Sequence, residues 1–415
     1  MFRRPITVPA LIAGISAMVM AAVMTMVVSP AASGAPVEGP AASVQGNDAV
    51  QRVLDRAVSG RGAPGILAEV SAGNVPWFGT AGFADTATER KRQPFDRYRI
   101  GSATKTFTAT VLLQLAGEGK LRLDDTVEKW LPGVVKGNGH DGSKITVRQL
   151  LNHTSGVFSY TNDPDMMARL VGQGFLDHRY DSMRPGELVA LAMKHAPDFA
   201  PGTSWAYSNT NYILAGMIVE RVSGRSLATE VNRRITSPLG LVNTYVPGES
   251  ATINGPHARH YSKLLLTDPA APVHDVTDMN TTSAGAAGNM ISTSGDLNRF
   301  YSALLGGRLL PAAQQKEMFT TVPTKNWIPD TGYGLGVISQ KLSCGVQVWG
   351  HVGTIHGSQS WTMGLRDGAK TVSTNVNGDW VDQVGISVDV MQAAFCPTAR
   401  QAAATRSTIR PLQLL

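Results

Sequence analysis

Ser102 and Lys105 stand three residues apart at the expected start of a helix, a spacing that could support nucleophilic catalysis. Apolar residues recur at helical spacing over 107–115, and Gly117 and Gly119 mark the expected end. Residues three apart on a helix are neighbours, so the hydroxyl and the amine share one face. A serine hydroxyl is a weak nucleophile that needs a base within hydrogen-bond reach, and this lysine could supply it. The alternative is a capping serine followed by a solvated lysine.

A second group with chemical potential is Tyr207-Ser208-Asn209, just before an expected helix over 212–222. A tyrosine hydroxyl beside a lysine ammonium loses its proton more easily and can act as a general base. An asparagine can orient the lysine and hydrogen-bond a substrate amide. The same pattern occurs in Tyr160-Thr161-Asn162. The alternative is a packed tyrosine with a helix-capping asparagine.

The third group is His351-Val352-Gly353, within a stretch that has glycines at 345, 350, 353 and 357. Glycines inside a strand often mark a close approach of other groups, so we predict an edge strand here. His351 could donate a hydrogen bond to a substrate or to Tyr207, or it could be a structural histidine.

The elements that must position these residues change in type along the chain. The N-terminal part predicts a helix over 47–60 and a hairpin of strands over 66–70 and 75–81. Helices are predicted in the middle and beyond it over 185–195, 212–222, 227–235, 296–305 and 311–319, with long loops over 250–285. The last part predicts strands over 333–339, 346–349, 361–365 and 371–376, and a closing helix over 381–395. We therefore predict one sheet built from both ends, with a helical region inserted between them.

The bulk composition favours a globular protein that does not bind nucleic acid. The 415 residues are 43% hydrophobic and 16% charged, which is enough to build a large core. The net charge is +6, but five arginines near the ends (3, 4, 400, 406 and 410) supply most of it. No basic stripe remains, which argues against a nucleic-acid partner.

The N-terminus predicts export. Arg3 and Arg4 precede an apolar run over 10–28 and small residues over 31–35, which is typical of a signal peptide over 1–35. An uncleaved membrane anchor is the alternative. Residues 36–46 are rich in Pro, Ala, Gly and Ser and predict a flexible lead-in. Residues 398–415 are expected to form a fraying or trimmed tail.

The two cysteines, Cys344 and Cys396, fit this compartment because an oxidising environment would let them pair. Two unpaired buried thiols are the alternative. Two cysteines are too few for a structural zinc site, and the sequence has no His-Glu-x-x-His, so no metal is expected. An ordinary α/β-hydrolase is disfavoured because no Gly-x-Ser-x-Gly occurs.

The motifs Ser-x-x-Lys, Tyr-x-Asn and His-x-Gly, in this order, resemble those of the penicillin-recognising serine hydrolases. The flanking stretches 99–101, 112–121, 207–211 and 287–293 are similar too. The chain most resembles the soluble, exported D-alanyl-D-alanine carboxypeptidases related to class C β-lactamases, from about residue 48 to Cys396.

This resemblance implies a β-lactamase/transpeptidase-like fold of the α/β plus all-α class. An antiparallel sheet flanked by helices would occupy about 47–101 and 286–397, with a helical subdomain over about 102–285, in a single domain over 47–397. It also implies a disulfide between Cys344 and Cys396 and no cofactor.

The same resemblance assigns roles to the motif residues. Ser102 would be the acylated nucleophile, and Lys105 and Tyr207 would share the base role. Asn209 would contact the substrate amide. His351 would bind substrate in the place that a lysine occupies in β-lactamases, which favours a peptidase.

The resemblance also implies an oxyanion hole made by the backbone N–H groups of Ser102 and Thr354, with Thr354 contacting substrate. One such donor typically lowers the barrier by about 3 kcal/mol. The sequence departs from the family pattern at three places. Val352 replaces a usual threonine, His356 stands where a neutral residue is expected, and 337–341 has no arginine to grip a terminal carboxylate.

We therefore predict an exported serine D-Ala-D-Ala carboxypeptidase that acts through an acyl-enzyme on D-alanyl peptides and binds β-lactams. We expect a monomer with small-molecule substrates and no stable membrane partner after signal cleavage. The alternatives are a β-lactamase-like hydrolase, a D-aminopeptidase or a carboxylic esterase of the same fold. A non-catalytic penicillin-binding protein is a further alternative.

Overall fold

The computed structural model describes residues 42–73 and 75–396. The signal peptide predicted over 1–35 and the tail predicted over 398–415 lie outside the described residues. Helix α1 (Ala42–Ser59) begins five residues before the predicted start at Asn47, so 42–46 are helical and not part of a lead-in. Among the described helices, none has the length and apolar character needed to cross a membrane.

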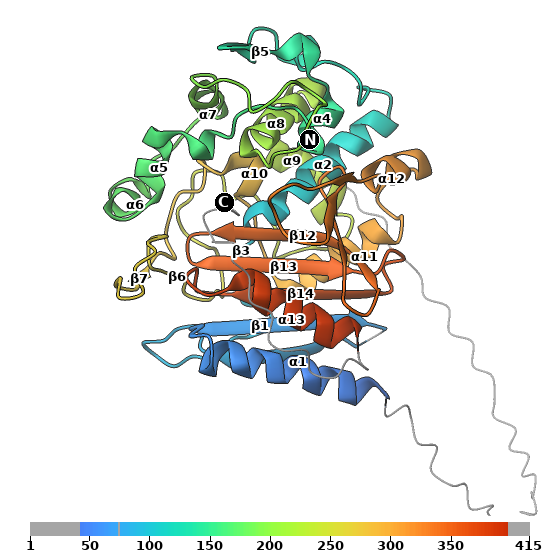
Figure 1. The fold of residues 1–415 in the computed structure, drawn as a ribbon. Helices are drawn as coiled ribbons and strands as arrows, with labels where there is room; N and C mark the ends of the chain where they lie inside the picture. The colour runs from blue at the N-terminus through green and yellow to red at the C-terminus, as the bar shows by residue number, and fades with distance from the viewer. Residues whose placement is uncertain (1–41, 74, 397–415) are drawn as a thin grey trace, which may run out of the picture. The chain divides into compact units, whose positions relative to one another are not determined.

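An eight-stranded sheet is built from both ends of the described chain (Figure 1), as the sequence predicts. All its neighbouring strands are antiparallel, in the order β2-β1-β14-β13-β12-β11-β10-β9. The strands are β1 (Gly65–Ala72), β2 (Trp77–Gly82), β9 (Val322–Pro323), β10 (Thr331–Tyr333), β11 (Ile338–Lys341), β12 (Gln347–Ile355), β13 (Ser358–Gly364) and β14 (Lys370–Val376). Three two-stranded pairs lie outside it: β3 (Tyr98–Arg99) with β8 (Ile291–Ser292), β4 (Lys136–Gly137) with β5 (His140–Asp141), and β6 (Tyr261–Ser262) with β7 (His274–Asp275).

The single strand predicted over 333–339 is wrong, because the chain reverses inside it. β10 ends at Tyr333 and β11 begins at Ile338, and the two pair as a hairpin. Gly336 in the turn has φ +80°, a conformation that favours glycine. A Cβ at position 336 would also lie 2.5 Å from the Cβ of Ala109 on a central helix.

Strand β12 is an interior strand over its first half and has one free side over its second half. It pairs with β13 along its length, but with β11 only up to Gly350. The free side of 351–355 faces the segment before Ser102: a Cβ at Gly353 would lie 1.9 Å from Ile100 O. The predicted edge strand with a close approach therefore holds for this half alone.

Helices cover both faces of the sheet (Figure 1). α1 and α13 (Gln383–Phe395) pack on one face and contact each other. α11 (Ser294–Leu305) packs against β1, β13 and β14 on the other face. Because successive residues of a strand point to opposite faces, the two faces have different chemistry. Val352, Trp361 and Met363 lie in the apolar core beneath α1 and α13.

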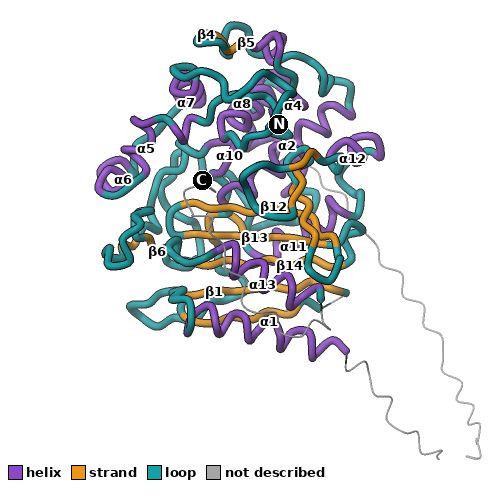
Figure 2. The backbone as a smooth tube through the Cα atoms, viewed as in Figure 1, coloured by secondary structure: helices purple, strands orange, loops and turns teal. Residues whose placement is uncertain are grey.

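The region between the two sheet-forming parts consists of helices joined by long loops (Figure 2). Its helices are α2 (Thr104–Gly117), α3 (Val127–Trp130), α4 (Val147–Leu151), α5 (Pro164–Leu170), α6 (Gln173–His178), α7 (Pro185–Ala192), α8 (Asn209–Ser223), α9 (Leu227–Val231) and α10 (Gly285–Gly288). Short 3-10 turns cover 101–103, 142–144 and 160–162, a π-helical turn covers 232–236, and α12 (Ala312–Met318) follows later in the chain.

Helix α2 is buried on all sides over most of its length, although four of its first seven residues are threonines. Each threonine hydroxyl has a partner that offsets its burial. Thr106 donates to Gly336 O at 2.7 Å and Thr108 to Ala286 O at 2.9 Å. These bonds tie the helix that carries the catalytic motif to both the sheet hairpin and α10.

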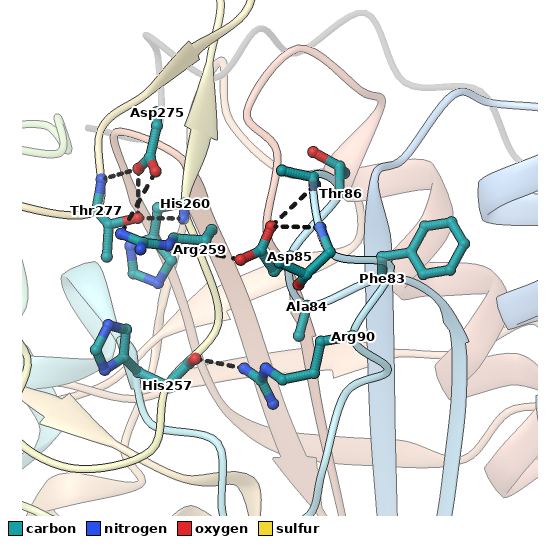
Figure 3. A network of polar contacts seen from close by, with 12 residues as sticks. Phe83, Ala84, Asp85, Thr86, Arg90, His257, Arg259, His260, Asp275 and Thr277 are labelled. Carbon is teal, nitrogen blue, oxygen red and sulfur yellow. Dashed lines mark hydrogen bonds and ion pairs between the residues drawn. The ribbon is translucent and has the colours of Figure 1, made fainter.

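The long loops over 250–285 are fixed to the segment after β2 by charged side chains (Figure 3). Arg259 lies 3.9 Å from the Asp85 carboxylate and 3.6 Å from the Asp275 carboxylate. Arg90 donates to His257 O at 2.5 Å. These contacts hold loops that also form part of the pocket described below.

Cys344 and Cys396 form a disulfide, with their Cα atoms 5.9 Å apart. It joins the turn between β11 and β12 to the residue after α13. The alternative of two free thiols is therefore wrong.

Candidate active site

Ser102 lies in a 3-10 turn, Gly101–Ala103, directly before α2. Its side chain is 3% exposed but borders a pocket. Gly101 adopts φ +52°, and Ile100 N donates to Met290 O at 3.0 Å. The backbone that leads into the Ser102 turn is thus held by a hydrogen bond before α2 begins.

Lys105 points at Ser102 from the first turn of α2 and is fully buried. Its Nζ has three neighbours: Ser102 Oγ at 2.8 Å, Asn209 Oδ1 at 2.7 Å and Ala287 O at 2.9 Å. The two amide oxygens can only accept, so they take two amine hydrogens. A neutral amine then has its lone pair left for the Ser102 hydroxyl proton.

Burial lowers the pKa of the Lys105 amine well below its usual value. No carboxylate contacts the amine among the hydrogen bonds and ion pairs of the described residues. A lysine in this environment loses its proton more readily than a solvated one and can serve as a general base.

Asn209 is the first residue of α8, three residues before the predicted helix start. Its backbone N–H donates to Ser159 Oγ at 3.1 Å, and its side-chain amide donates to Thr161 Oγ1 at 3.3 Å. The side-chain oxygen is thereby turned toward Lys105. The structure brings Ser102, Lys105 and Asn209 together, and Ser102 and Asn209 both line the pocket.

Tyr207 is close to this centre, but its surroundings do not suit the predicted base role. Burial raises the pKa of its hydroxyl, and a contact with Ser102 lowers that pKa only in part. Lys105 Nζ lies 4.8 Å from the centre of the tyrosine ring, and its own pKa is lowered, so it offers little positive charge. Tyr207 therefore carries a neutral hydroxyl, and the base role that the sequence assigns to it stays a prediction.

His351 does not reach the pocket. Its ring is fully buried, with Nδ1 donating to Val352 O at 2.5 Å and Nε2 accepting from the Tyr333 hydroxyl at 2.7 Å. Burial lowers the pKa of His351 to about 3, so the ring is neutral. The hydrogen bonds of the His351 ring go to Tyr333 and Val352 O and not to Tyr207, so its substrate-binding role stays a prediction. Tyr333 carried no motif in the sequence.

His153 is a site residue whose role the sequence pattern did not reveal. Its Nδ1 accepts from Ser208 N at 3.2 Å and from the Asn211 side chain at 3.1 Å. Its ring lies 4.4 Å from the Tyr207 ring and 4.7 Å from the Tyr333 ring. His153 therefore holds the Tyr207-Ser208-Asn209 segment in place through a hydrogen bond to Ser208 and a ring contact with Tyr207.

The backbone N–H groups of Ser102 and Thr354 lie close together, as the predicted oxyanion hole requires. A Cβ at Gly101 would lie 2.7 Å from Thr354 N, and one at Gly353 would lie 2.9 Å from Ser102 N. The two glycines therefore permit this approach. The Thr354 side chain points away and donates to Gln383 Oε1 at 2.6 Å, so its contribution to the site is the backbone.

Val352 also faces away from the site, so its departure from the usual threonine of the family does not change the lining of the pocket. It is 1% exposed and lies in the core beneath α1 and α13, opposite Trp361 on β13. Strand alternation explains this result, because residues 352 and 354 share the face that α13 covers.

A pocket of about 70 Å³ opens beside Ser102. Its apolar lining comes mainly from Met166, Leu170, Phe175, Met279 and Ile355. The rival triplet contributes to the wall: Tyr160 and Thr161 line the pocket, and the Tyr160 hydroxyl donates to Ser283 O at 2.6 Å. Helices α5 and α6, which supply part of the wall, had no counterpart among the predicted elements.

Two arginines line this pocket from the helical side, in place of the arginine expected on β11. Arg169 is paired with the Asp181 carboxylate at 3.0 Å. Arg179 donates to Asp275 O at 3.1 Å. The Arg169 charge is therefore paired with a carboxylate, whereas the bond of Arg179 to a backbone oxygen leaves its positive charge in place. Within the described residues, no group of three or more His, Cys, Asp or Glu side chains is arranged to hold a metal.

The fold and the site are those of a serine hydrolase with a buried lysine beside the serine. The profile of the Beta-lactamase family matches residues 50–384, so the chain belongs to this family.

Two curated relatives are penicillin-binding proteins. The chain is 26% identical over 321 residues to penicillin-binding protein 4* of Bacillus subtilis (strain 168), covering 74% of this chain and 66% of the relative. It is 31% identical over 274 residues to penicillin-binding protein 4 of Amycolatopsis lactamdurans, covering 64% and 68%. The chain thus spans about two thirds of the length of each.

Two similar solved structures carry other activities in their names. A D-stereospecific amidohydrolase from Streptomyces sp. is 55% identical, with a TM-score of 0.79 over 85% of this chain and 99% of that one. The D-amino acid amidase of Ochrobactrum anthropi SV3, complexed with L-phenylalanine amide, is 27% identical, with a TM-score of 0.74 over the same shares.

Proposed function

We propose that this serine hydrolase is a D-stereospecific amidohydrolase, which cleaves amides of D-amino acids or of short D-peptides through an acyl-enzyme on Ser102. The observation that carries the chemistry is the 2.8 Å contact between Lys105 Nζ and Ser102 Oγ, with both amine hydrogens engaged elsewhere. The likeness to the D-stereospecific amidohydrolase over 99% of its length supports the substrate class.

The proposed reaction follows from this geometry. Lys105 takes the Ser102 hydroxyl proton as Oγ bonds to the amide carbon. The resulting oxyanion accepts hydrogen bonds from Ser102 N and Thr354 N. The C–N bond then breaks, and the leaving nitrogen takes a proton from Lys105, directly or through the neutral Tyr207 hydroxyl. A water molecule, deprotonated by Lys105, then attacks the ester carbon. The bond between this carbon and Ser102 Oγ breaks, Lys105 returns the proton to Oγ, and the D-amino acid leaves.

The lack of an arginine in 337–341, the strand expected to grip a terminal carboxylate, favours an amide over a peptide with a free terminal carboxylate. A carboxypeptidase needs a partner for that carboxylate, and a bidentate arginine is the usual one. Arg169 and Arg179 border the pocket, but each is held by Asp181 or Asp275 O. The D-Ala-D-Ala carboxypeptidase activity predicted from sequence is therefore our second candidate, supported by these two arginines and by the penicillin-binding relatives.

The test compares four substrates with one purified protein: D-alanine amide, L-alanine amide, a peptide ending in D-Ala-D-Ala, and a cephalosporin. We expect ammonia release from the D-amide at least about a hundredfold faster than from the L-amide, and none from Ser102→Ala. Faster D-alanine release from the peptide would favour the carboxypeptidase. Faster cephalosporin turnover, or no Ser102-dependent turnover of any substrate, would overturn the proposal.

Export is also part of this proposal. The signal-like segment over 1–35 and the Cys344–Cys396 disulfide both support an oxidising compartment. Detection of the protein in culture medium, against a variant lacking Arg3 and Arg4, tests it.

A further inference from the structure

His356, at the turn after β12, reaches across the pocket to the helical wall. Its ring stacks on Phe175 of α6, with ring centroids 3.8 Å apart and an angle of 12°. Its Nε2 lies 2.7 Å from Leu170 O at the end of α5. All three residues line the pocket, and His356 itself is 2% exposed. One side chain thus contacts both helices of the opposite wall.

The hydrogen bond from His356 gives the Leu170 carbonyl a partner that helix α5 itself does not provide. Leu170 is the last residue of α5, and the final carbonyls of a helix lack partners within it. Since a carbonyl only accepts, Nε2 of His356 must donate. Burial lowers the pKa of His356 to about 4, so the neutral ring with its proton on Nε2 is the form present at neutral pH.

The segment that joins α5 to α6 is held by a hydrogen bond to another part of the chain. Gly172, between α5 and α6, has φ +61° and donates to Leu264 O at 3.0 Å. Phe175 packs with Ile355 and Met279 in a small apolar cluster separate from the two main cores. The turn between β12 and β13, which carries His356, is also held in place, because Gly357 N donates to the Asp379 carboxylate at 2.9 Å.

We propose that His356 is a specificity-determining residue that closes the acyl pocket and sets the largest acyl side chain that Ser102 can accept. This inference rests on the proposed amidohydrolase function. The pocket of about 70 Å³ is about half the roughly 150 Å³ cavity that holds a benzene ring. The wall next to His356 is apolar, with Phe175, Met279 and Ile355, and the pocket is small, so the enzyme selects small side chains, such as that of D-alanine, over aromatic ones.

The experiment measures kcat/KM for D-tryptophan amide and D-alanine amide and compares their ratio between variants. His356→Ala removes the ring and the tether, and we expect the ratio to rise about tenfold or more, a change typical of altered pocket volume. His356→Gln keeps an N–H donor for Leu170 O, and we expect a rise of about threefold. Phe175→Leu keeps the hydrogen bond and also raises the ratio.

A ratio separates selectivity from general damage, because partial unfolding reduces both rates alike. His274→Ala, on β7 and away from the pocket lining, is the matched control and should leave the ratio unchanged. If His356→Ala does not fold, the kcat/KM ratios of His356→Gln and Phe175→Leu test the size limit instead. Ratios within twofold of wild type in these variants would overturn the inference.

The failure of the proposed function has a different signature. If wild type cleaves no D-amide, the amidohydrolase proposal fails, and the size limit is then measured on ester acylation of Ser102. The ratio of p-nitrophenyl phenylacetate to p-nitrophenyl acetate turnover should rise about tenfold in His356→Ala. An unchanged ester ratio would overturn the size limit independently of amide cleavage.

Discussion

The acylation centre and the acyl pocket beside it are built in different ways. Ser102, Lys105 and Asn209 lie at the starts of two packed helices, and three hydrogen bonds hold the Lys105 amine. The pocket is lined by loops and short helices, with Phe175 and His356 meeting across it. Proton transfer needs a dry and rigid site, whereas side-chain selection needs only a surface of the right size. In our proposal the centre therefore carries the chemistry, and the pocket selects the substrate.

The largest effect should come from Ser102→Ala, which removes the nucleophile from the centre. We expect amide turnover to fall by roughly 10⁶-fold, as for other catalytic serines. Intact-mass spectrometry after incubation with a slow ester or a penicillin should show an adduct on wild type and none on the variant. An equal adduct on both proteins would place the nucleophile elsewhere.

Lys105→Arg tests whether the amine acts as a base or only as a charge. An arginine keeps a cation but does not lose its proton in a protein, so we expect acylation to fall by about 10³-fold. The matched control is Lys316→Arg on exposed α12, which should leave the rate unchanged. Activity within tenfold of wild type in Lys105→Arg would refute the base role.

Tyr207→Phe separates Lys105 from Tyr207 as the base. Because the neutral lysine is the active form, the acylation rate should rise with pH through the lowered Lys105 pKa, below the usual lysine range. Removing the Tyr207 hydroxyl should reduce the rate by about a hundredfold and leave this rise in place. Loss of the rise in a pH–rate profile would instead support the base role predicted from sequence.

The smallest effect on activity should come from Val352→Thr, although this restores the usual family residue. Position 352 faces the core beneath α1 and α13, so we expect kcat/KM within about twofold of wild type. The added hydroxyl would be buried without a designed partner, at a cost of about 2 kcal/mol in the free energy of unfolding. Thermal melting and steady-state kinetics together check both parts. A large gain in carboxypeptidase activity would contradict the orientation of Val352.

The sequence by itself determined the acylation motif and the sheet built from both ends. Ser102 and Lys105 are one helical turn apart, so local geometry alone places them together, and strand periodicity is likewise a local property. The sequence did not determine whether Lys105 or Tyr207 is the better candidate for the base. The relative pKa values of Lys105 and Tyr207 depend on burial, which forms only when α2 and α8 pack.

The tertiary structure also decided the direction in which the third motif points and what closes the pocket. His351 turns to Tyr333, and Val352 turns to the core, because the register of β12 assigns alternate residues to opposite faces. His356 meets Phe175 and Leu170 across 181 and 186 residues of sequence, where no local spacing can signal a contact. Motif spacing thus carried the chemistry, whereas long-range packing carried the selectivity.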